Sequence, residues 1–429
     1  MNYTDLASPD FYRDPYPFYQ HLRQAGNLVP IAPRTLITGH ADIARTVLGD
    51  RKMGKNYLEA VRTRYGEDGV NQPVFQALSK MLVMMNPPAH TRLRALLMKA
   101  FNARQIDLLR DISQSAADEL IDAFEASRSI DLVSEFASPM PIRIICKVMD
   151  VPVDHAPMLG ADVGRLAQAL EAAPLSAEQV AAANAALENI ERYFKAVIAT
   201  RREHPGTDLI STMLSINDNG ETFSENEIIW NVIFIFAAGH ETTSNMIGNA
   251  LIALHKHPDQ LEKLRAHPEL LTQAINECMR YDSSVQIVQR VALEDTDIHG
   301  VAVPKGTIVL LSLGATNRDP MQFDQPDTLL IERPESANAP LVFSGGIHYC
   351  LGARLAMFEL ETALGTILRR LPDLRLTNLD ALQWHQRNTL RGVTSLLGHI
   401  DQRPLRRVAT MTAANPVPAD PSPAIRTTP

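Results

Sequence analysis

Apolar residues recur at a spacing near 3.6 through most of this chain, and that spacing predicts helices. A break at Pro205-Gly206 separates two helical series. The predicted helices cover residues 11–24, 41–48, 91–101, 103–127, 139–149, 161–173, 177–202, 208–216, 225–255, 258–267, 268–281 and 353–368.

Strand-like patterns are short. The segment 297–312 has turn residues at Gly300 and at 304–306, which predicts short strands, and 29–39 and 374–397 also resemble strands. Residues 50–80 predict irregular structure with short helices. The chain therefore predicts a mainly α fold with a small β-rich part.

Composition then limits the class of protein. The 429 residues are 45% hydrophobic and 21% charged, enough apolar material for a large core. No linker divides the middle, so we predict one domain over residues 1–409 and a disordered Pro-rich tail over 410–429. The net charge of −8 disfavours a nucleic-acid-binding protein.

The cellular location follows from two further features. No stretch reads as a secretory signal or as a run of eighteen apolar residues, so we expect no membrane span. Three cysteines in a chain of this length form no disulfide framework, which favours a reducing compartment. We expect a cytoplasmic monomer.

The predicted helix 225–255 is apolar on nearly all sides over its first half and should cross the core. Its centre nevertheless carries Ala238-Gly239-His240-Glu241-Thr242-Thr243. An acid and two hydroxyls cost free energy in a buried helix unless they are hydrogen-bonded. They indicate either a kinked helix with satisfied side chains or a group with a chemical task.

Cys350 lies in the glycine-rich stretch 343–354, which reads FSGGIHYCLGAR and precedes an apolar helical run. Backbone N–H groups and the helix dipole at such a place favour thiolate over thiol. A thiolate there could be a nucleophile, a redox thiol or a metal ligand. Cys146 and Cys278 lie in helix-like apolar contexts and predict small buried side chains.

This stretch resembles the haem-binding loop of the cytochrome P450 family, whose pattern is Phe-x-x-Gly-x-(His/Arg)-x-Cys-x-Gly. Phe343, Gly346, His348, Cys350 and Gly352 fill every position of it. The resemblance implies haem b (iron protoporphyrin IX), buried between the long helix and the cysteine loop, with Cys350 as the thiolate ligand of its iron.

The centre of the long helix resembles the oxygen-binding motif of the same family, (Ala/Gly)-Gly-x-(Asp/Glu)-Thr. The match implies that Ala238 borders the haem and that the helix opens locally beside it. Thr242 would hydrogen-bond the bound oxygen, and Glu241 would help to deliver protons with water.

Two further sets of residues match family positions. His90 and Arg94, at i and i+4 of one helix, together with Arg290 and His348, would bind the haem propionates, whereas Arg92 should lie at the surface. Glu277 and Arg280 should pair, with Arg333 as the third member of a structural network.

The resemblance covers residues 10–400 and implies a monooxygenase of the bacterial soluble class. It would insert one oxygen atom from O2 into a hydrophobic small molecule, by hydroxylation or epoxidation in polyketide or macrolide biosynthesis. Pocket positions carried over from the family, in 60–85, 168–180, 237–238 and 285–288, are mostly apolar or small. A fatty-acid or terpenoid hydroxylase is the alternative.

Other classes remain open at this point. A haem protein that senses gas or carries a ligand would not need the Glu241-Thr242 pair, and a peroxide-using relative would tend to lose it. The chain leaves no room for a reductase domain, so we expect a separate ferredoxin and ferredoxin reductase. Their docking site would be a basic patch near the cysteine loop, with Arg354, Arg369 and Arg370 as candidates.

Overall fold

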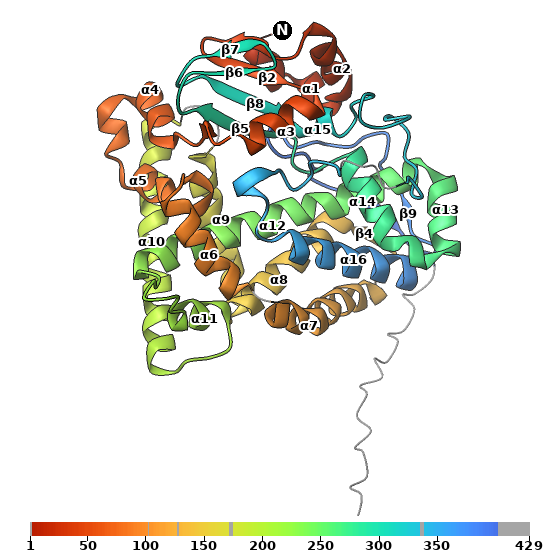
Figure 1. Ribbon diagram of the computed structural model, residues 1–429. Coiled ribbons are helices and arrows are strands. Elements are labelled where there is room, and N and C mark those ends of the chain that lie inside the picture. The colour runs from red at the N-terminus through yellow and green to blue at the C-terminus, as the bar shows by residue number, and fades with distance from the viewer. Residues whose placement is uncertain (1, 102, 127, 171–174, 335–338, 402–429) are drawn as a thin grey trace, which may run out of the picture.

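Helices form most of the molecule, and a five-stranded sheet lies at one end of it (Figure 1). The structure is a computed structural model that describes every residue except 1, 102, 127, 171–174, 335–338 and 402–429. The mainly α fold predicted from the sequence is confirmed, whereas the predicted tail, 410–429, lies outside the described residues.

The described helices follow the predicted series closely. They are α1 (Pro9–Arg13), α2 (Tyr16–Ala25), α3 (Ala41–Gly49), α4 (Tyr57–Val70), α5 (Pro73–Ser79), α6 (Ala89–Ala100), α7 (Ala103–Asp122), α8 (Pro139–Val148), α9 (Ala156–Gln168), α10 (Ala177–Glu203), α11 (Leu209–Ser215), α12 (Glu225–Lys256), α13 (Pro258–Ala266), α14 (Leu271–Tyr281), α15 (Leu313–Thr316) and α16 (Ala353–Arg370).

The strands form three small sheets. The largest has the order β1-β2-β8-β5-β3, with β2 and β8 parallel and the other pairs antiparallel. The strands are β1 (Val29–Ala32), β2 (Thr35–Thr38), β3 (Met53–Gly54), β4 (Ser129–Asp131), β5 (Ile287–Ala292), β6 (Thr296–Ile298), β7 (Val301–Val303), β8 (Ile308–Ser312), β9 (Arg375–Leu376) and β10 (Leu397–His399).

The strand prediction for 374–397 was largely wrong. Only short strands flank this segment, β9 at its start and β10 at its end, and the described residues between them form turns with one-residue bridges such as Trp384–Val393. Arg391 explains part of the difference, because it stacks on the Trp384 ring and pairs with the buried Asp282. Side-chain contacts of this kind hold the segment in place of a continuous ladder.

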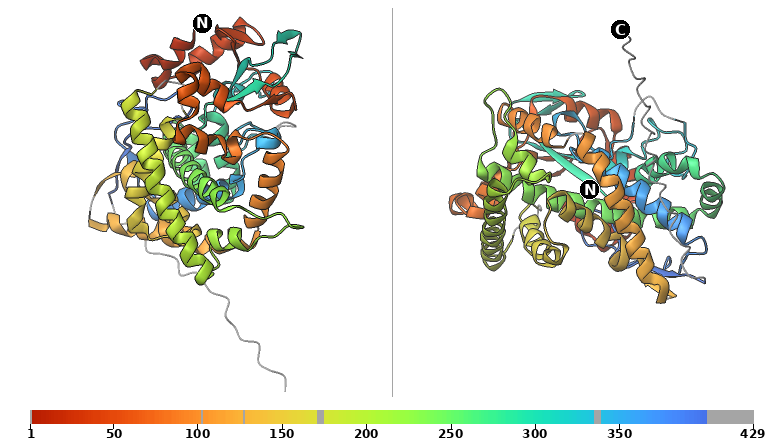
Figure 2. Two further views of the ribbon diagram at one scale, coloured as in Figure 1. Left: turned by 90° about the vertical axis from the view of Figure 1, so that its left-hand side faces the viewer. Right: turned by 90° about the horizontal axis from the view of Figure 1, so that it is seen from below.

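Helix α12 crosses the middle of the molecule, where it packs against α8, α9, α10, α14 and α16 (Figures 1 and 2). A capping box begins it: Ser224 accepts from the Glu227 N–H, and the Glu227 carboxylate accepts from the Ser224 N–H. Arg92 of α6 pairs with Glu227 and Glu221, so it ties α6 to this end. None of the described helices is both long enough and apolar enough to cross a membrane.

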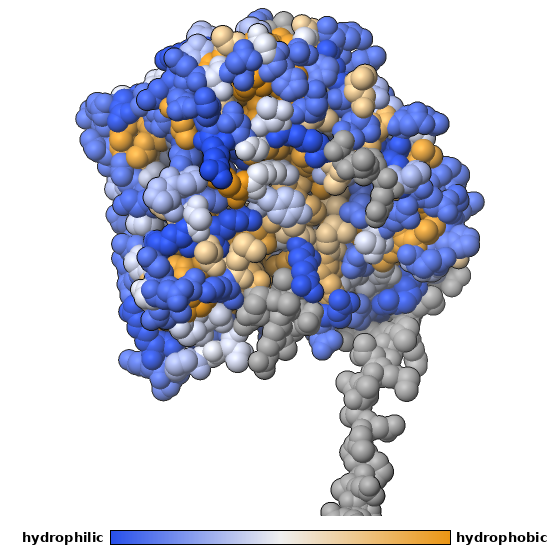
Figure 3. Space-filling model, viewed as in Figure 1, coloured by the Kyte–Doolittle hydropathy of each residue, from blue (hydrophilic) through white to orange (hydrophobic). Residues whose placement is uncertain are grey.

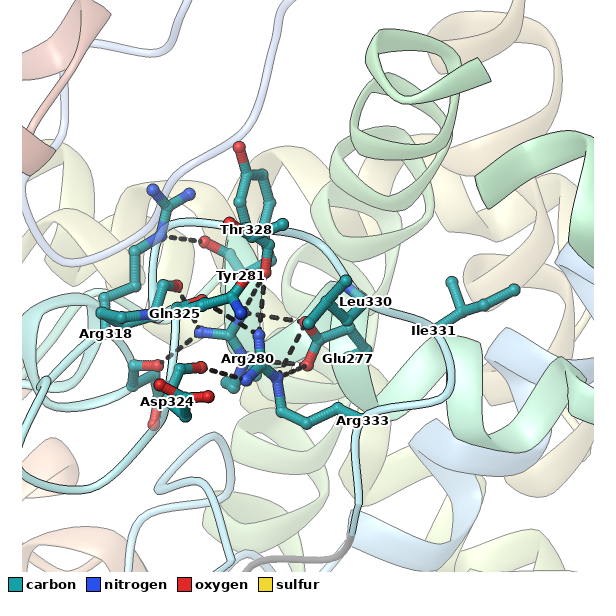
Figure 4. A network of polar contacts seen from close by, with 12 residues as sticks. Glu277, Arg280, Tyr281, Arg318, Asp324, Gln325, Thr328, Leu330, Ile331 and Arg333 are labelled. Carbon is teal, nitrogen blue, oxygen red and sulfur yellow. Dashed lines mark hydrogen bonds and ion pairs between the residues drawn. The ribbon is translucent and has the colours of Figure 1, made fainter. Parts of the chain in front are cut away.

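A buried ion network joins α14 to the segment that leads to the cysteine loop (Figure 4). Glu277 accepts two hydrogen bonds from Arg280, at 2.8 and 2.9 Å, and two from Nε of Arg333, at 3.0 and 3.1 Å. The predicted pairing is therefore confirmed. Arg280 is 1% exposed, and its remaining N–H groups bond to the carbonyls of Asn317, Pro326 and Thr328.

The segment that leads to the cysteine loop is also attached to the residues just before that loop and to α3. The Asn317 side chain accepts from the Leu341 N–H at 2.8 Å, and Asp319 accepts from the N–H of Ala41 at the start of α3. Gly346 then packs directly on α3. It has a φ of +65°, and a Cβ there would lie 1.8 Å from the Leu48 carbonyl oxygen, so glycine is required.

Removing the Glu277 charge should destabilise the whole protein. Glu277→Gln would leave Arg280 buried without its anion, and we expect a loss of about 3–5 kcal/mol in the free energy of unfolding. Glu332→Gln is the matched control, since Glu332 forms a half-exposed pair with Lys263 and should cost less than about 1 kcal/mol. Urea unfolding of both variants measures the difference, and equal losses would contradict a structural role for the network.

Candidate active site

Cys350 lies between the short 3-10 turn Gly346–His348 and the first turn of α16. Its N–H donates to the Phe343 carbonyl at 3.1 Å, which closes the loop, and its sulfur accepts from the Gly352 N–H. Cys350 is exposed because it borders a cavity on one side and an outer groove on the other. Cys146 and Cys278 are buried, as predicted.

The prediction that the loop favours a thiolate needs correction. Although part of Cys350 is exposed to the cavity and the groove, the protein atoms packed around it desolvate the thiol and raise its pKa, and the Gly352 N–H and Arg94 oppose the rise. In the chain alone the neutral thiol is therefore favoured at neutral pH. A cation held at the sulfur would reverse this preference, as metals do for coordinating thiols.

The cavity beside Cys350 has a volume of about 220 Å³ and is mostly apolar. Ala238, Gly239, Thr242 and Thr243 of α12 border it, so the predicted Ala238 and Thr242 lie on the same cavity as the cysteine. Other lining side chains include Leu82, Val83, Phe101, Ile145, Phe234 and Leu355. Leu82 and Val83 come from the predicted 60–85 stretch, whereas Val285 and Val288 pack against a separate hydrophobic cluster of α3 and sheet residues.

Thr242 shows how the polar centre of α12 is accommodated. Its hydroxyl donates to the Ala238 carbonyl at 2.7 Å, one turn earlier on the helix. The helix is continuous from Glu225 to Lys256, so the expected local opening does not interrupt it. Bonding back to the helix satisfies the hydroxyl without a break in the backbone.

Glu241 lies on a different face of α12 from Thr242. It borders a second, larger cavity of about 820 Å³, where its carboxylate forms an ion pair with Arg387. His240, Ser244 and His385 border the same cavity. The structure therefore separates the two neighbouring residues that the motif joins in sequence.

The four predicted propionate ligands converge at the edge of the smaller cavity. His90 and Arg94 come from α6, Arg290 from β5 and His348 from the cysteine loop. The His90 and His348 rings lie 4.5 Å apart, and Arg94 donates to the Tyr349 carbonyl at 2.8 Å. Both nitrogens of His90, Nε2 of His348 and Nη2 of Arg290 are buried without a hydrogen-bond partner among the described residues.

Burial lowers the pKa of each of these groups, and neighbouring cations lower those of the two histidines further. The pKa of His348 is lowered to about 2. Burial is the largest cause, and the nearby groups Arg290, Lys55, His90 and Arg94 add to it. Burial lowers the pKa of Arg290 to about 10, and burial and Arg290 lower that of Lys55 to about 7.

Lys55 was not predicted from the sequence because it belongs to no recognisable motif. It follows β3, which pairs with β5, the strand that carries Arg290.

These residues fit the haem that the sequence resemblance implies. Buried N–H donors without acceptors call for an anionic partner, and two carboxylates at the edge of a flat group would supply it. A Cβ on Gly352 would enter open space, so the loop leaves room next to the sulfur. Gly346, by contrast, serves the contact with α3 rather than any bound group. Phe343 lines the outer groove with Tyr349.

Comparisons with known proteins agree on one family. The family model described as "Cytochrome P450" matches residues 167–372. A putative cytochrome P450 133B1 from Xylella fastidiosa is 49% identical over 397 residues, which cover 92% of this chain and 98% of that protein.

Two solved structures extend the likeness to the fold. P450BioI, in complex with an acyl carrier protein ligated to hexadec-9Z-enoic acid, gives a TM-score of 0.85 at 31% identity and covers 92% of this chain and 100% of its own. PksS, the P450 of the bacillaene polyketide synthase of Bacillus subtilis, gives 0.83 at 29% identity and covers 92% of this chain and 99% of its own.

Thiol alkylation should distinguish the three cysteines. In the native apoprotein we expect iodoacetamide to label Cys350, because Cys146 and Cys278 are buried and burial raises the pKa of Cys146 to about 11. Since the pKa of Cys350 is also raised, its labelling rate should still increase above pH 9, where an ordinary thiol levels off. Cys350→Ala is the control, and comparable labelling of Cys278 in the folded protein would contradict the structure.

Proposed function

Because the chain belongs to the cytochrome P450 family of oxygen-dependent haem-thiolate monooxygenases, we propose that it binds haem b through Cys350 and oxidises a hydrophobic small molecule. The observation that carries this proposal is the shared cavity of Cys350 and Thr242, next to a group of His and Arg side chains of which several nitrogens lack a hydrogen-bond partner among the described residues.

The protein's residues have separable tasks in this proposal. Cys350 would hold the iron, and His90, Arg94, Arg290 and His348 would hold the propionates. When bound, the haem supplies the electron-transfer and oxygen chemistry that amino-acid side chains lack.

The remaining side chains control water and protons. Apolar residues such as Phe234 and Ile235 exclude bulk water from the cavity. Thr242 donates its Oγ1 proton to the Ala238 carbonyl, and this bond holds the hydroxyl at the cavity wall. Such a hydroxyl has no evident use in a protein that only senses a gas or carries a ligand, which favours the enzyme.

Two substrate classes have support. We favour hydroxylation or epoxidation of a polyketide in secondary metabolism, and the similarity to PksS supports this choice. Fatty-acyl oxidation is the second candidate, because P450BioI resembles this chain equally well and binds a hexadecenoyl carrier protein. The apolar lining of the cavity suits either class.

We propose a ferredoxin and its reductase as electron donors in the cytoplasm, where free cysteines remain reduced. The outer groove at Cys350, about 520 Å³, is a candidate docking site, lined by Met98, Tyr349, Arg354 and Met357. Figure 3 shows hydrophobic surface in the hollow of this face, between hydrophilic margins. Arg370 is excluded as a docking residue because it is buried and paired with Asp118 and Asp122.

The ligand assignment can be tested by spectroscopy. The haem-reconstituted wild type, reduced and exposed to carbon monoxide, should show the strongly red-shifted Soret band of thiolate ligation. Cys350→Ala should lose this band, whereas Cys278→Ala, which changes a thiol buried away from the cavity, should keep it. A red-shifted band in Cys350→Ala would overturn the assignment and the proposed function.

The docking site can be tested by charge reversal. Arg354 is exposed beside Cys350, whereas Arg369 is exposed about 22 Å further along α16. Arg354→Glu should slow reduction by an acidic ferredoxin by roughly tenfold at low salt, with a smaller effect at high salt. Arg369→Glu is the matched control; stopped-flow reduction that is equally slow in both variants would place the docking site elsewhere.

A further inference from the structure

The larger cavity, of about 820 Å³, has no task in the proposed function. It is bordered by α9, one face of α12, residues of the N-terminal segment and the turn at 385–388. Of the residues that the structure describes, none borders both this cavity and the cavity of Cys350. Its volume is in the range of ligand sites, about 300–1,000 Å³, so it is large enough for a small organic molecule.

Asn245 of α12 provides a buried donor at this cavity. Its side chain is 7% exposed, and its Nδ2 atom has no hydrogen-bond partner among the described residues. The backbone of Gly392 packs closely on this side chain, since a Cβ there would lie 2.1 Å from Oδ1 of Asn245. A buried N–H group without an acceptor is costly, and a carbonyl oxygen of a bound molecule would satisfy it.

His240 provides a matching acceptor on the same helix. Its ring is hydrogen-bonded to the backbone of Ser138, whereas Nε2 is buried without a partner in the described part of the chain. Burial lowers the pKa of His240, although Glu241 and the bond to Ser138 oppose this, so the neutral ring is favoured. In a neutral ring whose Nδ1–H donates to a carbonyl, Nε2 accepts, and a hydroxyl group would satisfy it.

The charged side chains of the lining are already engaged. Glu241 pairs with Arg387, and Arg165 pairs with the buried Asp162. Burial also lowers the pKa of His385, which favours its neutral form. Much of the remaining lining is apolar, including Val133, Val163, Phe236 and Ala237. The cavity is therefore suited to a neutral molecule with an apolar body.

Two glycines of α9 leave open space at this cavity. Gly160 and Gly164 lie one turn apart, and a Cβ at either position would meet no atom within 4 Å. Glycine inside a helix is less favourable than alanine, and packing against the described residues gives no reason for it here. Room for a bound molecule supplies that reason.

We propose that the larger cavity is a second small-molecule site, which binds a neutral molecule with an apolar body, a hydroxyl group and a carbonyl oxygen. The hydroxyl group donates to Nε2 of His240, and the carbonyl oxygen accepts from Nδ2 of Asn245. These two residues lie about 7.5 Å apart along the helix axis, so the two polar groups of the ligand are well separated. The inference goes beyond the proposed function, because binding here needs neither oxygen nor reductant.

Calorimetric titration with two steroids tests the site. Corticosterone carries ketones and hydroxyl groups on an apolar ring system, and progesterone has the same skeleton and ketones without the hydroxyl groups. The haem-loaded protein is titrated in saturating imidazole, which ligates the iron and blocks the cavity of Cys350. We expect corticosterone to bind under these conditions, at least about tenfold more tightly than progesterone. Binding that imidazole abolishes, or equal affinity for both steroids, overturns the proposal.

Substitution of the two polar residues separates their roles. Asn245→Leu should weaken both steroids about tenfold, because both carry ketones. His240→Phe should weaken corticosterone about tenfold and leave progesterone unchanged, so that the two steroids then bind alike. If the preference for corticosterone persists in His240→Phe, the hydroxyl group is recognised elsewhere and the proposed contact is wrong.

Filling the cavity gives an independent check. Gly160→Leu should weaken both steroids at least about tenfold, since its side chain would enter the open space. Gly49→Leu in α3 is the matched control, because Gly49 also has open space around its Cβ position but borders neither cavity. Wild-type affinity in Gly160→Leu would exclude this cavity as the site.

The second site and the proposed function fail separately. Each variant should keep the red-shifted Soret band of the reduced carbonyl complex, because none of the substituted residues borders the cavity of Cys350. A wild type that lacks this band yet binds corticosterone with the expected dependence on Asn245 and His240 retains the second site, although the proposed function fails. A wild type that shows the band but does not bind corticosterone retains the function and loses the second site.

Discussion

The buried carboxylate of Glu277 is the constraint on which the site depends. Two arginines, Arg280 and Arg333, surround it, and their other N–H groups bond to carbonyls of the segment before the cysteine loop. Burying three charged groups is favourable only when each is fully hydrogen-bonded. The network therefore fixes the path of residues 317–333, and that path brings Cys350 opposite the centre of α12, where Thr242 lies.

The sequence predicted the long helices and the site motifs because both are encoded locally. The helical spacing of apolar residues predicts α12, and the spacing of the glycines and His348 around Cys350 indicates the cysteine loop. What could not be predicted depends on contacts between distant segments. Arg391, stacked on Trp384 and paired with Asp282, replaces the expected strands near the C-terminus. Lys55 joins the cation group through strand pairing, and Arg370 is buried by acids of α7.

Neighbouring residues on α12 face different surroundings, and this changes how the polar motif works. Thr242 and Thr243 border the apolar cavity, whereas Glu241 and Ser244 border the larger one. The acid next to Thr242 in the sequence is paired with Arg387, and the acid that shares its cavity, Glu359, comes from another helix. Spacing alone could not reveal this, because Glu359 lies within an ordinary apolar helical pattern.

The position of α12 between two cavities also has an evolutionary consequence. Residues of α9, the N-terminal segment and the turn at 385–388 border the large cavity but not the small one. Mutations in these elements can reshape one compartment while the cysteine, the threonines and the cation group are inherited unchanged. Descendants of such a protein can therefore differ in the shape of the large cavity and still share one reaction centre.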